Sequence, residues 1–171
     1  FADGAIVGNL FTSPSAQDAI NVGAAADNGG GVILTAGNYA GDVLHFDEAA
    51  KTLTAQGIPA KTIYVTDDVA SASRGEESKR RGIAGDFVVF KAMAAAAETG
   101  YSLDEVLRVG HHANDNTRTM GVAFSGCTLP GQSEPLFNVP AGQMGVGLGI
   151  HGEPGVSEEP VPTARELAGE L

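Results

Sequence analysis

One histidine stands in a glycine-rich turn, where its ring could meet a ligand at close range. His151 lies between Gly149 and Gly152, in the run Gly147-Leu148-Gly149-Ile150-His151-Gly152-Glu153-Pro154-Gly155. A neutral imidazole nitrogen is nucleophilic near neutral pH, and small neighbours leave room for a reacting group. The alternative is a histidine that is only hydrogen-bonded within the turn.

The same run also contains the pattern G-x-G-x-x-G. That pattern indicates a dinucleotide site only where the last glycine opens a helix after a strand. Glu153-Pro154-Gly155 follows at once and argues against a helix there. We therefore predict a strand over residues 144–150, followed by a turn that contains His151.

A carboxylate is the second candidate for chemistry. Asp42 follows the tight turn Asn38-Tyr39-Ala40-Gly41, just past the carboxyl end of a short apolar strand, Val32-Ile33-Leu34. Open α/β sheets place their ligand crevices at this end of the strands. A carboxylate there can accept a hydrogen bond from an alcohol and orient it for attack. The alternative role is a helix N-cap, and the two roles are compatible.

The other polar clusters in the sequence lack the residue spacing of a metal site or a nucleotide site. Asp67-Asp68 ends a predicted strand without further carboxylates at a defined spacing, so capping or loop structure is favoured over metal binding. Gly29-Gly30-Gly31 follows a helix and precedes a strand, the reverse of a phosphate-binding loop. We expect this chain to bind neither a metal nor a cofactor.

These residues must be positioned by alternating strands and helices. The periodicity predicts helices over residues 15–26, 42–57, 83–99 and 102–113, and strands over 32–34, 61–66, 118–124 and 144–150. Alternation in the first part predicts an α/β fold with an open parallel or mixed sheet layer over residues 1–100. A second, smaller α+β domain over residues 101–171 would then carry the histidine loop. The acidic tail from Ser157, with two prolines, is expected to be loosely held.

Composition limits the classes of partner. The 171 residues are 43% hydrophobic, which suffices for a packed core. A formal charge of −11 opposes binding to nucleic acid and to anionic lipid. No apolar run approaches the roughly 20 residues that cross a bilayer, no leader peptide is visible, and Cys127 is the only cysteine. We expect a cytoplasmic protein that contacts neither nucleic acid nor membrane.

Five segments together resemble the substrate-binding subunit of dihydroxyacetone (glycerone) kinases. They occur in the order found in that family and are Asn38–Leu44, Asp67–Ala70, Arg80–Gly85, Ser125–Gly131 and Gly147–Gly155. The resemblance implies that His151 adds to the ketone carbon of dihydroxyacetone as a covalent hemiaminal. It also implies that Asp42 binds substrate hydroxyls and assists the hydroxyl that receives phosphate.

Two positions depart from the family pattern. Gly37 stands where many relatives carry a lysine that contacts substrate, and His45 stands where the commoner kinases have asparagine. These changes leave a longer ketose such as erythrulose as a competitor to dihydroxyacetone.

The resemblance also implies partners. A separate domain or subunit would supply phosphate from ATP with magnesium, or relayed from phosphoenolpyruvate, and the substrate subunits would form a homodimer. In the family a preceding segment carries the general base in a Gly-His-Glu-Pro loop, so we expect this chain alone to be inactive. A ketose-sensing co-regulator that transfers no phosphate is the alternative from another functional class.

Overall fold

The computed structural model describes residues 1–171, which form two compact units. Unit 1 comprises Phe1–Asp67 and Arg81–Thr117, and unit 2 comprises Asp68–Arg80 and Arg118–Leu171. The elements in chain order are α1 (Ala16–Ala26), β1 (Val32–Gly37), α2 (Ala40–Ala55), β2 (Ala60–Val65), the 3-10 helix η1 (Glu77–Lys79), α3 (Gly85–Glu98), α4 (Leu103–Asn116), β3 (Val122–Ala123), β4 (Gln143–Val146), β5 (Ser157–Pro160) and α5 (Ala164–Glu170).

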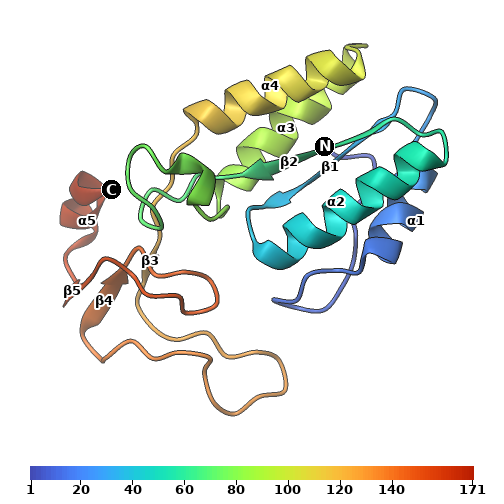
Figure 1. Cartoon of the computed structure of the whole chain (residues 1–171). Helices are drawn as coiled ribbons and strands as arrows, with labels where there is room; N and C mark the ends of the chain where they lie inside the picture. The colour runs from blue at the N-terminus through green and yellow to red at the C-terminus, as the bar shows by residue number, and fades with distance from the viewer. The chain divides into compact units, whose positions relative to one another are not determined.

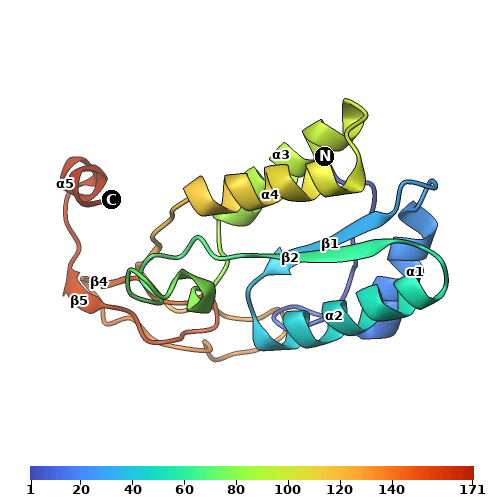
Figure 2. The ribbon, with the colours of Figure 1, turned by 45° about the horizontal axis from the view of Figure 1, so that its top comes forward.

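Unit 1 is a three-layer α/β arrangement around two parallel strands. β1 pairs with β2 from Val32↔Ala60 to Gly37↔Val65. Helices α1 and α2 cover one face of this sheet, and α3 and α4 cover the other (Figures 1 and 2). Two apolar clusters follow from this layering, one built around Phe46 and Leu53 and the other around Val89 and Met93. The predicted parallel sheet is confirmed.

Helices α1 and α4 of unit 1 begin at capping signals that the sequence carries. Ser15 Oγ accepts a hydrogen bond of 3.1 Å from the Asp18 amide at the start of α1. The Glu105 carboxylate accepts from the Ser102 amide at 2.8 Å at the start of α4. Such caps satisfy amides that have no partner inside the helix. The predicted helices therefore match the observed ones to within a few residues.

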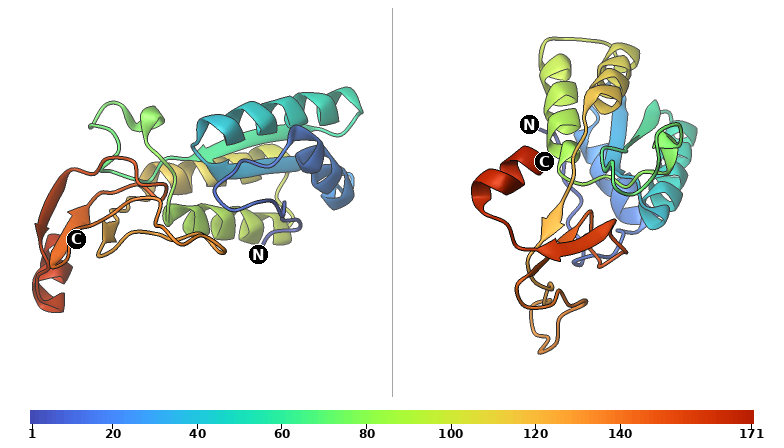
Figure 3. Two further views of the ribbon diagram at one scale, coloured as in Figure 1. Left: turned by 90° about the horizontal axis from the view of Figure 1, so that it is seen from below. Right: turned by 90° about the vertical axis from the view of Figure 1, so that its left-hand side faces the viewer.

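Unit 2 contains a three-stranded antiparallel sheet in the order β3-β4-β5. β3 and β4 are shorter than the predicted strands over 118–124 and 144–150. Thr119 forms only an isolated parallel bridge with Asp68, and residues 147–150 belong to the histidine turn. Figure 3 shows this region in orange and red.

The expectation of a loosely held tail is wrong for residues Ser157–Pro160, whereas α5 buries none of its residues. Residues Ser157–Pro160 pair with β4 as strand β5, and α5 follows with its own capping box, in which the Thr163 amide donates to Glu166 at 2.8 Å. Acidic composition suggested disorder, but backbone pairing to an existing strand needs no apolar side chains. The T-x-x-E signal at Thr163 was present in the sequence.

The fold class is therefore a small parallel sheet layered with helices, followed by a small antiparallel sheet. Helix α4, which begins just after the predicted boundary near Tyr101, packs on α3 within unit 1. The division into domains over 1–100 and 101–171 stays a prediction. No helix combines the length and the apolar character that a membrane crossing requires.

Candidate functional site

The histidine run forms a tight turn. The Glu153 carbonyl accepts from the Gly149 amide at 3.0 Å, and the Gly149 carbonyl accepts from the Gly152 amide at 2.9 Å. Gly152 has φ +84°, and a Cβ there would lie 2.7 Å from the Phe137 ring, so only glycine fits without rearrangement. No helix opens within residues 147–155, which removes the dinucleotide interpretation of the glycine pattern.

Glu153 holds His151 in one orientation and one tautomer. Its carboxylate lies 2.8 Å from Nδ1 of His151 and accepts a further hydrogen bond of 3.0 Å from the His151 amide. Burial raises the pKa of Glu153, but the hydrogen bonds from the His151 ring and from backbone amides outweigh it and hold that pKa below its ordinary value. An ionised carboxylate can only accept, so Nδ1 must carry the proton. The lone pair is thereby placed on Nε2 of a half-exposed ring.

Asp42 lies in the first turn of α2, at the carboxyl end of the parallel sheet. The N-cap residue is Tyr39, so the N-cap role considered for Asp42 is wrong, because α2 begins earlier, at Ala40. The half-buried Asp42 carboxylate makes no hydrogen bond within the chain. It is therefore available to accept from a hydroxyl group of a ligand, as predicted for the substrate.

The remaining predicted residues, Gly37 and His45, also belong to unit 1, whereas His151 belongs to unit 2. His45 Nδ1 donates to the Pro14 carbonyl at 2.7 Å and lies 3.2 Å from Ser13 Oγ, so this nitrogen ties the chain before α1 to α2. Gly37 ends β1, and a Cβ on it would lie 3.0 Å from the Tyr39 ring. A lysine at position 37 would therefore be crowded.

Asp67, the first residue of the acidic pair after β2, has a structural role. The buried Asp67 carboxylate accepts from the Ile83 amide at 2.9 Å and from the Gly85 amide at 2.8 Å. A negative charge at these amides also stabilises the positive end of the α3 dipole. No group of three or more His, Cys, Asp or Glu side chains is arranged to hold a metal ion.

Sequence reasoning missed Asp86, in the first turn of α3. Burial, followed by the charges of Asp67 and Asp42, raises the pKa of Asp86 to about 7. Its Oδ1 is buried and has no hydrogen-bond partner. The only sequence signal was an acidic residue close after the turn at Gly82, at the beginning of a predicted helix.

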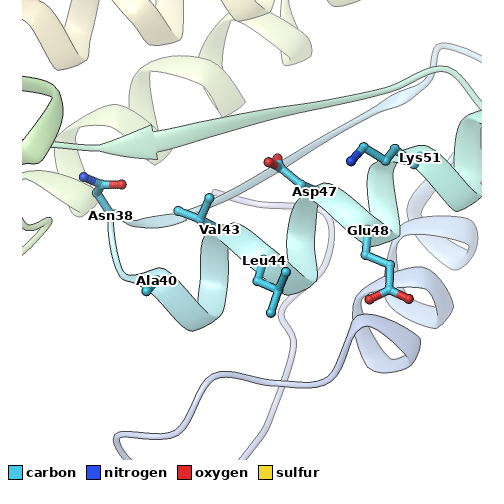
Figure 4. A pocket seen from close by; sticks show the side chains of 7 residues that line it. All are labelled: Asn38, Ala40, Val43, Leu44, Asp47, Glu48 and Lys51. Carbon is cyan, nitrogen blue, oxygen red and sulfur yellow. The ribbon is translucent and has the colours of Figure 1, made fainter.

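An open groove of about 610 Å³ runs along α2 (Figure 4). It is lined by Asn38, Ala40, Val43, Leu44, Asp47, Glu48 and Lys51 and contains none of the four predicted site residues. The Asp47 carboxylate already has partners within the chain, because its Oδ1 accepts hydrogen bonds from the Tyr64 hydroxyl at 2.8 Å and from the Thr62 hydroxyl at 3.0 Å. None of the predicted substrate contacts therefore lines this groove.

The chain belongs to the Dak1 domain family, whose model matches residues 1–171. The resemblance to the substrate-binding part of dihydroxyacetone kinases is thus confirmed. D-erythrulose kinase of Mycolicibacterium smegmatis is 64% identical over all of this chain and 30% of that protein. L-erythrulose kinase of Pectobacterium atrosepticum is 62% identical over 98% of this chain and 28% of that protein.

A solved structure has the same fold. The dihydroxyacetone kinase of C. freundii, in complex with AMP-PNP and Mg²⁺, superposes with a TM-score of 0.84 at 32% identity, over 98% of this chain and 31% of that one. The chain therefore spans about a third or less of the length of each of these three proteins.

Proposed function

We propose that this chain is the substrate-holding domain of a kinase that phosphorylates a short ketose, with erythrulose preferred to dihydroxyacetone. The preference is supported by the two erythrulose kinases that are more than 60% identical to it. Gly37, in place of the lysine expected of dihydroxyacetone kinases, supports the same choice.

The observation that carries the chemistry is the contact of 2.8 Å between Nδ1 of His151 and Glu153. With the proton on Nδ1, the Nε2 lone pair attacks the ketone carbon, and the carbonyl π electrons move to oxygen, which takes a proton from solvent. The ring becomes positively charged as the N–C bond forms, and the Glu153 carboxylate accepts the Nδ1 proton and passes it to solvent, which balances the proton taken up by oxygen. The product is a neutral hemiaminal. Because only a carbonyl can form it, a simple polyol would be rejected.

Asp42 is proposed to bind and orient a hydroxyl group of the substrate. Its carboxylate, without a partner in the chain, accepts a hydrogen bond from a substrate hydroxyl and orients that oxygen toward phosphate. Phosphate must come from elsewhere, since transfer requires a bound donor and the neutralisation of its charge. The relative bound to AMP-PNP and Mg²⁺ favours an ATP-dependent donor domain over relayed phosphoenolpyruvate.

A ketose-sensing co-regulator is the competing function. The two relatives that are more than 60% identical are named as kinases, which favours the kinase. The homodimer, the cytoplasmic location and the inactivity of this chain alone stay predictions.

The test is carbon NMR of erythrulose labelled at its carbonyl, added to the full-length protein. A tetrahedral-carbon signal that broadens with the protein is expected, and it should vanish in His151→Ala. His112→Ala, an exposed histidine on α4, is the matched control and should keep the signal. If the full-length protein gives no such signal with erythrulose or dihydroxyacetone, the covalent assignment is wrong. Phosphorylation of the ketose on addition of ATP and Mg²⁺ then separates kinase from sensor.

A further inference from the structure

Asp86 carries a carboxyl oxygen that is cut off from solvent and left without a partner. The residue lies in the first turn of α3, within unit 1, and its Oδ1 makes no hydrogen bond. Burying a polar atom without a partner is unfavourable, and such groups in native proteins call for a specific explanation. Packing alone would be served as well by an apolar side chain.

The position of that oxygen is next to the carboxyl ends of both parallel strands. A Cβ placed on Gly82 would lie 3.0 Å from Asp86 Oδ1, 2.5 Å from the Gly37 Cα and 2.6 Å from the Val65 carbonyl. Gly37 is the last residue of β1, and Val65 is the last residue of β2. The Asp86 carboxyl therefore adjoins the edge of the sheet where α/β folds bind ligands.

The surroundings of Asp86 favour its protonated form. Burial, then the charge of Asp67 at the end of β2, then the charge of Asp42 in α2, all raise its pKa, to about 7. Asp67 is held as an acceptor by the amides of Ile83 and Gly85. A protonated Asp86 carboxyl offers a donor and the Asp42 carboxyl offers an acceptor, which together are the pair that a hydroxyl group needs.

We propose, building on the function above, that Asp86 is a specificity-determining residue that donates a hydrogen bond to a hydroxyl of a four-carbon ketose. It takes over the donor role that a lysine at position 37 would otherwise fill. Erythrulose has one more hydroxyl-bearing carbon than dihydroxyacetone. When dihydroxyacetone is bound instead, the buried Asp86 carboxyl has no hydroxyl to pair with. The unpaired carboxyl is unfavourable, so the site discriminates against dihydroxyacetone.

The experiment compares kcat/KM for erythrulose and dihydroxyacetone in the full-length protein and in its Asp86→Ala and Asp86→Asn variants. Asp86→Ala should lower kcat/KM for erythrulose by about tenfold to hundredfold, mainly through KM, and that for dihydroxyacetone by less than about threefold. Asp86→Asn keeps a donor and a similar shape, so it should retain most of the activity toward erythrulose. It should also keep its KM at pH 8.5, where the wild-type KM rises because Asp86 has ionised.

Each outcome decides one question. Equal losses on both ketoses, or no loss on either, overturn the specificity role of Asp86 while leaving the ketose site intact. A wild-type protein that binds neither ketose overturns the proposed function instead. If Asp86→Ala fails to fold, the pH dependence of Asp86→Asn tests the proposal instead. An Asp86→Asn protein whose KM for erythrulose follows the wild-type pH profile would contradict hydrogen-bond donation by Asp86.

Discussion

The Glu153 carboxylate binds both the ring and the backbone of the same histidine. One oxygen lies 2.8 Å from His151 Nδ1, and the other accepts from the His151 amide at 3.0 Å. Because both oxygens are used, the carboxylate cannot rotate without losing a bond, and the imidazole keeps its orientation. Residue 153 therefore sets which ring nitrogen of His151 carries the lone pair.

Replacing Glu153 by glutamine should weaken the covalent adduct. The amide can accept from only one of the two N–H groups, and its own NH₂ opposes the other. We expect Glu153→Gln to lower the adduct fraction in carbon NMR by about tenfold to hundredfold, by analogy with the range seen when a group that orients a metal-ligating histidine is removed. A purely structural role would leave the pH profile of adduct formation unchanged, whereas loss of tautomer control should shift it.

Asp86 should make the stability of the protein depend on pH. Its pKa is raised to about 7 in the folded protein, so the folded state holds a proton that the unfolded state has released. The corresponding stability is present at about pH 4 and is lost as pH rises toward 7. Between pH 5 and pH 7.5, wild type should lose roughly 2 kcal/mol relative to Asp86→Asn, visible in the thermal unfolding midpoint. Parallel pH dependence of the two midpoints would show that Asp86 titrates normally.

Gly85 should tolerate no side chain. A Cβ on it would lie 2.4 Å from Asp67 Cγ, at the carboxylate that holds the start of α3. Gly85→Ala should therefore destabilise the protein by about 2 kcal/mol or more. Gly30→Ala is the control, because nothing lies within 4 Å of its Cβ. If Gly85→Ala and Gly30→Ala have the same unfolding midpoint, this account of the α3 N-terminus is contradicted.

Restoring a lysine at position 37 should not convert the protein into a dihydroxyacetone kinase. The new Cβ would lie 3.0 Å from the Tyr39 ring and 3.1 Å from the Gly82 carbonyl. Gly37→Lys should cost about 1–3 kcal/mol of stability through overpacking. Its kcat/KM for dihydroxyacetone should not rise above wild type. A stable Gly37→Lys variant with improved activity toward dihydroxyacetone would instead show that the Tyr39 side chain can move to make room for the lysine.

Much of unit 1 could be predicted because its signals are local. Ser15 and the Ser102/Glu105 pair define helix starts through contacts three residues away, and the apolar period of each segment selects helix or strand. The first part of the tail, Ser157–Pro160, was mispredicted because β5 depends on pairing with β4, a contact that composition does not encode.

The same division applies to the site. The sequence alone determined that His151 stands in a glycine-rich turn and that Asp42 follows a strand, because both facts depend on neighbours along the chain. Only the tertiary structure decided that Asp86 adjoins Gly82 and the end of β1, and that Asp67 and Asp42 raise its pKa. Burial and the field of distant charges arise when separate segments pack together, and no spacing in the sequence specifies them.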